Sequence, residues 1–190
     1  MAFWGTNLDS GMRDPKRKFR FKVSIGDLGG GSGIVWYAKT VNKPTMNISG
    51  DTTHKFMGHT FNFPGSVSWD EIEITLVDPA EENEGGVDAA AELLKVIENS
   101  GYRFPKAPDQ LETISKGKAT EALGAVVISQ LDASGKTIEE WTLHNPFITK
   151  VSFNDLSYED DGLSEINLGI KFDWATFSKT AGGQSQFFEP

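Results

Sequence analysis

The sequence predicts a mainly β domain, an antiparallel β-sandwich or partial barrel into which one α-helix is inserted. Apolar residues alternate with polar ones in several short runs, which is the period of half-buried strands, and only one segment has the spacing of an amphipathic helix. The 190 residues, of which 38% are hydrophobic and 11% aromatic, are enough for one domain with a sizeable core.

Alternation is strongest in residues 19–25, 69–77 and 165–174. In the last run Ile166, Leu168, Ile170, Phe172 and Trp174 alternate with polar residues and glycine, a pattern that does not fit a helix. We expect further strands at 34–41, 56–63, 123–131, 136–143 and 147–153. Residues 29–33 are predicted to form a hairpin tip, and residues 132–135 are predicted to form a short turn. Residues 175–190 are expected to form a tail without a further strand.

The one predicted helix covers residues 87–99. Its apolar residues recur at steps of three and four, and Gly101 is a suitable stop. Residues 43–55 are expected to be irregular. Residues 102–121, with their prolines and mixed charges, are expected to be a loop. The apolar residues of the helical stripe are Val87, Ala90, Ala91, Leu94 and Ile97.

Composition excludes several classes of protein. The chain has no cysteine, which rules out disulfides and thiolate chemistry, and its net charge of −9 disfavours a basic nucleic-acid reader. No catalytic or dinucleotide motif is present, so we expect no enzyme, catalytic residue, cofactor or metal. His54 and His59 are expected not to share a face of one strand. No apolar run reaches the ~20 residues of a membrane span, and the first residues do not resemble a secretory signal, so synthesis in a cytoplasm is expected.

The charge is unevenly distributed. Residues 1–22 contain six basic and two acidic residues, a balance of +4, so residues 23–190 carry −13. A basic N-terminal arm can dock on the acidic body of a second copy; a solvated terminus and nucleic-acid binding are the alternatives. The phenylalanine pair near the end indicates a partner surface. The candidate contact residues between subunits or rings are Arg13, Lys16, Arg17, Lys18, Phe187 and Phe188.

Several segments in order resemble the tail tube proteins of contractile-tailed bacteriophages. They are residues 16–25, the stretch 37–45 with its proline turn, residues 55–59, the acidic and aromatic start of 67–78, the helix after it, and residues 141–174 with Asn145-Pro146. The resemblance covers about residues 16–174. It divides the chain into an N-terminal arm (1–17), a tail tube β domain (18–174) and a C-terminal extension (175–190).

The resemblance implies a structural role in the virion. Family members form hexameric rings that stack into a tube, and strands of all six subunits complete one large shared barrel around the channel. Implied partners are the sheath protein, the baseplate and tail terminator proteins, the tape measure protein and transient, non-specific DNA in the lumen, without membrane insertion. An acidic lumen would repel phosphates. Candidates for its lining, from the polar faces of alternating strands, are Glu71, Glu73, Glu165, Asn167 and Asp173.

The sequence is also compatible with other functions. One is the tube of a secretion or bacteriocin injection machine, which is related to the phage tube, and another is a baseplate tube initiator that does not polymerise. A third, of a different class, is a carbohydrate-binding β-sandwich that uses tryptophans such as Trp4 or Trp36.

Overall fold

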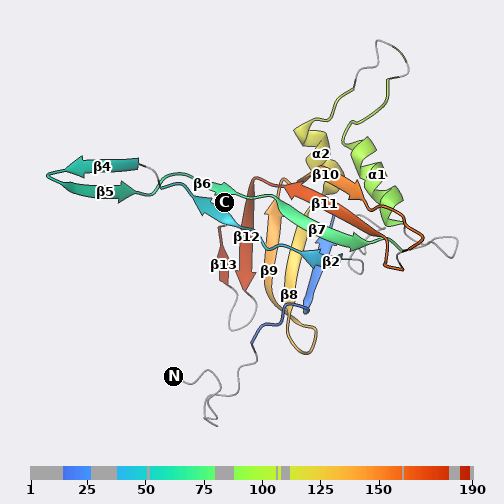
Figure 1. Ribbon diagram of the computed structural model, residues 1–190, viewed down its shortest axis with the longest axis horizontal. Coiled ribbons are helices and arrows are strands. Elements are labelled where there is room, and N and C mark those ends of the chain that lie inside the picture. Colours follow the sequence, from blue (N-terminus) through green and yellow to red (C-terminus); the bar gives the residue numbers. More distant parts are fainter. Residues whose placement is uncertain are drawn as a thin grey trace, which may run out of the picture.

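The computed structural model describes residues 15–26, 38–50, 52–79, 88–105, 107, 112–159, 161–179 and 185–188. It confirms a mainly antiparallel β architecture. Two sheets form the body, and their strands cross each other in Figure 1. The five-stranded sheet has the order β1 (Phe21–Ile25), β8 (Val126–Leu131), β9 (Thr137–His144), β12 (Trp174–Lys179) and β13 (Ser185–Phe187). The four-stranded sheet has the order β10 (Phe147–Phe153), β11 (Glu165–Lys171), β7 (Ile72–Val77) and β2 (Ala38–Val41).

The core lies between the inner faces of the two sheets. Register pairs the apolar residues of β7 with those of β11, so that Ile74 lies opposite Leu168, and both side chains are almost fully buried. This confirms that the apolar faces of these strands pack the core. Other members of the same cluster are Ile72, Leu76, Ile166 and Ile170 from this sheet, Val23, Ile25 and Leu143 from the other, and Leu93 and Val96 from a helix.

That helix, α1 (Ala89–Asn99), confirms the predicted helix. Asp88 precedes it, and its carboxylate accepts hydrogen bonds from the backbone N–H groups of Ala90 and Ala91, which caps the first turn. The predicted apolar stripe was wrong in its position. The face that meets the core carries Ala89, Leu93 and Val96, while Leu94 is exposed.

A second helix, α2 (Lys116–Leu123), corrects the expectation of a single helix and of a loop through residue 121. Ala119 and Leu123 are its buried residues and Ala122 is partly buried against the core, so the helix has few apolar positions and the sequence carries little helical periodicity. The helix begins after Ser115, whose hydroxyl accepts from the N–H of Lys118, and ends at Gly124, whose φ is +68°. Packing of its two buried residues on the body stabilises this short helix more than its intrinsic propensity does.

Residues 43–63 also differ from the prediction. The expected single strand 56–63 is a hairpin of β4 (Thr52–Phe56) and β5 (His59–Phe63), which reverses at Met57 and Gly58 with φ of +48° and +83°. In the stretch expected to be irregular, β3 (Met46–Ile48) pairs with β6 (Val67–Trp69). Residues 46–69 thus form one two-stranded extension of β2 and β7, which we call the projecting ribbon (Figure 1).

The last predicted strand ends at Lys171 rather than at Trp174. The chain turns a corner at Phe172 and Asp173, and Trp174 begins β12 in the other sheet. Burial shifts by one residue at the corner, because Phe172 and Ala175 are buried whereas Trp174 is only partly buried. Residues 175–179 and 185–187, expected to run out, therefore belong to strands. The predicted hairpin tip at 29–33 and the start of the 34–41 strand lie outside the described residues. Among the described helices, none has the length and apolar character to cross a membrane.

Candidate assembly surfaces

Four of the five residues predicted to face a lumen lie together on the outer face of the four-stranded sheet. Glu73 lies opposite Gly169, and Asn167 lies opposite Thr75, whose hydroxyl donates a 2.9 Å hydrogen bond to the Asn167 side chain. Glu71, which precedes β7, accepts from the Thr149 hydroxyl, and Glu165 forms an ion pair with Lys39. The structure therefore brings these four predicted residues together on one polar face.

Asp173 lies apart from that face, at the corner between β11 and β12. The ammonium of Lys116 approaches its two carboxylate oxygens at 2.6 and 2.8 Å, and the Asn145 amide donates a third bond at 2.8 Å. The hydrogen bond from Lys116, then that from Asn145, holds the pKa of Asp173 below its ordinary value. This carboxylate thus joins α2 to the corner.

The outer face of the four-stranded sheet is mixed in charge. Lys150 lies opposite Gly169, Lys171 follows two residues later on the same side of β11, and Lys39 reaches Glu165. These three lysines balance the three glutamates of the face, Glu71, Glu73 and Glu165. The local charge is therefore balanced, although the chain as a whole carries −9.

Both edge strands of the four-stranded sheet lack an outer partner among the described residues. Within the described part of the chain, β2 pairs only with β7 and β10 pairs only with β11, so each presents one unpaired row of backbone N–H and C=O groups. Such edges are templates for pairing with another strand.

The projecting ribbon exposes almost all of its side chains. Register places Phe56, Phe61 and Phe63 on one face of the β4–β5 hairpin, and each remains about half exposed. The opposite face carries only Thr53, Lys55, Thr60 and Asn62. An isolated two-stranded ribbon with a solvent-exposed aromatic face is marginal in water, so this face is a candidate contact surface.

The ribbon also corrects the expectation for the two histidines. Because Phe56 pairs with His59 and His54 pairs with Phe61, both imidazoles lie on the aromatic face as diagonal neighbours. The prediction treated residues 56–63 as one strand and therefore placed them on different faces. No group of three or more metal-ligating side chains occurs among the residues that the structure describes.

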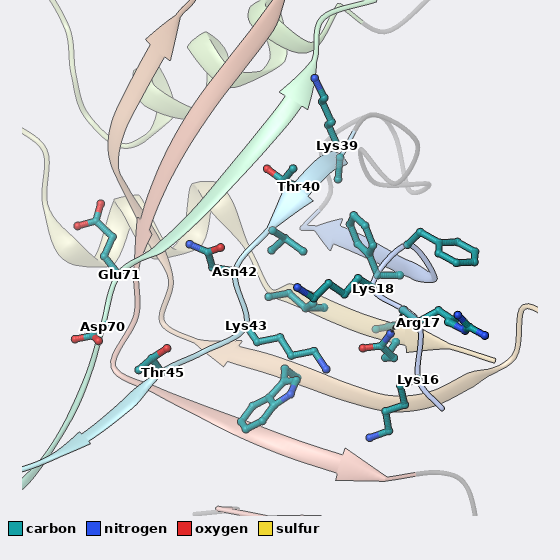
Figure 2. A pocket seen from close by; sticks show the side chains of 18 residues that line it. Lys16, Arg17, Lys18, Lys39, Thr40, Asn42, Lys43, Thr45, Asp70 and Glu71 are labelled. Carbon is teal, nitrogen blue, oxygen red and sulfur yellow. Dashed lines mark hydrogen bonds between the residues drawn. The ribbon is translucent and has the colours of Figure 1, made fainter. Parts of the chain in front are cut away.

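A cleft of about 1310 Å³ opens between β2 and the start of β1, where the N-terminal segment enters the body (Figure 2). Lys16, Arg17 and Lys18, predicted as contacts between subunits, form one wall. The Gln130 side chain donates to the carbonyl of Arg17 at 2.7 Å, which ties this segment to its own β8. Arg13, predicted with them, lies outside the described residues.

Beside the cleft, Glu139 joins three parts of the chain. This buried side chain of β9 forms ion pairs with Lys16 of the N-terminal segment and Lys43 after β2. Burial by itself would raise the pKa of Glu139, but the hydrogen bonds from the two lysines outweigh it, and the pKa lies below its ordinary value. The triad fixes the N-terminal segment and the base of the projecting ribbon on the five-stranded sheet.

Phe187 and Phe188 pack against their own body but stay about half exposed. The Phe187 ring lies 5.9 Å from that of Phe177, and the Phe188 ring meets Trp69 edge-on at 6.2 Å. The aromatic pair therefore closes the end of the five-stranded sheet over the base of the ribbon.

Sequence reasoning missed the projecting ribbon and the cleft. The Met57-Gly58 step between two aromatic, β-rich runs was a usable hairpin signal. No local signal announces the cleft, because its walls come from segments far apart in the chain.

No protein-family model matches the sequence, and no curated protein matches it. Solved structures do. The tube-terminating cap of the anti-feeding prophage superposes with a TM-score of 0.63 at 16% identity, covering 92% of this chain and 98% of that one. The sheath/tube terminator of the extracellular contractile injection system PVC gives 0.62 at 16% identity, covering 88% and 99%. The PVC sheath-tube complex in its extended state gives 0.60 at 15% identity, covering 93% and 99%. The chain thus has the fold of the tube and tube-terminator proteins of contractile injection systems, as its resemblance to tail tube proteins predicted.

Proposed function

We propose that this chain is a structural, non-enzymatic subunit of the tube of a contractile injection apparatus. Two observations together support the proposal. The chain shares its fold with the solved neighbours over almost their full length, and its four-stranded sheet has open edges among the described residues. A monomer with this arrangement leaves hydrogen-bonding groups and aromatic surface without partners, and assembly supplies them.

The strand order of the four-stranded sheet supports ring closure. All of its neighbouring strands are antiparallel, so the β10 edge of a second copy, related by rotation about a ring axis, would run antiparallel to β2. Each copy then adds four strands to a common barrel without a free edge. Six copies per ring is the number that the resemblance implies.

Stacking uses the projecting ribbon. It extends away from the four-stranded sheet in Figure 1, and its aromatic face has no partner among the described residues. Contact with the next ring would bury that face. The basic N-terminal arm is a second contributor to stacking, as its charge opposite to that of the body suggests.

The outer face of the four-stranded sheet would line the bore of such a barrel, with Glu71, Glu73, Glu165 and Asn167 exposed to the channel. Its balanced charge would make it a non-adhesive wall rather than a strongly repulsive one. If the apparatus is a phage tail, the tube is part of the virion and its bore conducts the genome. The partners of the tube are then the sheath, baseplate, terminator and tape measure proteins. In a secretion or bacteriocin machine the same tube is part of an injection particle.

A tube terminator is the second candidate. Two of the three neighbours described above belong to terminator or cap structures, with TM-scores close to that of the tube complex. A terminator forms one ring on the tube end and does not continue the stack.

Light scattering coupled to size exclusion, together with negative-stain microscopy of the purified full chain, tests both candidates. A tube protein gives rings and rods as concentration rises into the micromolar range, whereas a terminator gives single rings only. Monomers at every concentration would contradict both. Binding to a glycan array by such monomers would instead support the carbohydrate-binding alternative.

A further inference from the structure

The cleft beside β2 exposes part of the inner face of the five-stranded sheet. Phe21, Ile128 and Trp141 line its floor at the place where the four-stranded sheet ends at its β2 edge. A further strand alongside β2 would extend the four-stranded sheet over this floor. Among the described residues no strand follows β2 on that side, so a strand added there would cover the cleft floor.

The rim of the cleft is basic. Five lysine or arginine side chains and two carboxylates line it. Lys16 and Lys43 are held by Glu139, and Lys39 is held by Glu165. Lys18, by contrast, makes no ion pair with any of the described residues. A ligand with carboxylates thus finds a cation there whose charge no described residue compensates.

The connection between β10 and β11, residues 154–164, has the complementary character. Its sequence contains four acidic residues, at positions 155, 159, 160 and 161, and no basic one. Leu156, Tyr158 and Leu163 are all strongly exposed on it. Large apolar side chains on an acidic loop indicate a surface that becomes covered by a basic, partly apolar partner.

Topology brings the two surfaces together. In an antiparallel pair, the end of one strand lies beside the beginning of the other. If β10 of a neighbouring copy pairs with β2, the 154–164 loop that follows β10 emerges next to Lys39, which lies at the start of β2 and lines the cleft.

We infer that the 154–164 loop of one copy docks in the basic cleft of the next copy, with its carboxylates at Lys18 and its apolar residues over the cleft floor. The inference rests on the proposed ring closure and deepens it. Main-chain pairing of β2 with β10 holds the ring together, and the loop in the cleft selects the correct neighbour and register.

Zero-length cross-linking tests the contact directly. A carbodiimide condenses a lysine amine with a carboxylate that touches it, so rings assembled from a mixture of ¹⁵N-labelled and unlabelled chains should give mixed-isotope peptides that join Lys18 to Asp155, Glu159 or Asp161. The Lys16–Glu139 pair provides an internal positive control, because its link should contain only one isotope within each peptide pair.

Charge reversal provides the functional readout. Lys18→Glu and Glu159→Lys should each raise the concentration for half-maximal ring formation about tenfold, since each places like charges at every interface of the ring. The double variant should recover most of the loss. Lys136→Glu, an exposed reversal on the β8–β9 turn that does not line the cleft, should leave ring formation unchanged.

The outcomes separate the two levels of the proposal. Rings that form normally in both single reversals, without mixed-isotope links to Lys18, overturn the docking inference and leave ring closure standing. A wild-type chain that forms no rings overturns ring closure and the docking inference with it.

Discussion

Replacement of the three ribbon phenylalanines by serine should abolish stacking and leave the monomer folded. Phe56, Phe61 and Phe63 are 61%, 49% and 51% exposed, so about half of each side chain remains to be buried in an assembly. Full burial of a Phe contributes ~1.5–3 kcal/mol, so the triple variant loses about 1 kcal/mol per residue, or about 3–4 kcal/mol per ribbon. That corresponds to a loss of ~10²–10³-fold in the ring–ring association constant per ribbon.

The assay separates assembly from folding. None of the core cluster lies in residues 46–68, so the free energy of unfolding measured in urea should change by less than ~0.5 kcal/mol per site. Sedimentation and microscopy should show rings without rods. The matched control is a triple variant of the opposite face of the same hairpin, in which serine replaces Thr53, Thr60 and Asn62. Rings of this control variant should stack normally. Equal loss of rods in both variants, or rods of wild-type length in the phenylalanine variant, would refute the assignment of the aromatic face to stacking.

Three further predictions concern the body. Glu139→Gln should lower the free energy of unfolding by about 1 kcal/mol, because Lys43 and the N-terminal segment lose their shared carboxylate. Since the pKa of Glu139 is depressed, its contribution to stability is present near neutral pH and is lost as pH falls below 4.5. Urea titrations at several pH values should therefore show a weaker pH dependence of stability in the variant than in the wild type. Gly26→Ala should destabilise the fold by ~2 kcal/mol or more, because Gly26 has φ of +44° and an added Cβ would overlap the Leu123 carbonyl oxygen. A melting temperature of the variant as high as that of the wild type would show that the chain relieves this overlap. Asp88→Ala should cost ~1 kcal/mol through the lost cap of α1, and Asp88→Asn should recover most of it in the same measurement.

The sequence by itself determined the strands and helix whose apolar periodicity reflects one-sided burial. Residues 72–77 and 165–171 alternate because one face of each is core, and apolar steps of three and four located α1, although they did not identify the face of α1 that meets the core. Period two and period 3.6 are local consequences of backbone geometry, so they can be read without knowing what lies opposite. The same reasoning placed Glu71 and Glu73 on the polar face of one strand and Glu165 and Asn167 on that of another, and the pairing of β7 with β11 joined the two faces.

The tertiary structure alone decided where the chain changes partner. The apolar alternation of the sequence runs through Phe172 to Trp174, yet the strand leaves one sheet and enters the other there, and Ala175 rather than Trp174 becomes the next buried residue. The hairpin of the projecting ribbon alternates aromatic and polar residues, but none of residues 46–68 belongs to the core cluster, so its pairing was decided by the tertiary structure. The balanced charge around Glu165 and the cleft beside β2 depend on which strands become neighbours, and strand order is set by contacts between residues far apart in the chain.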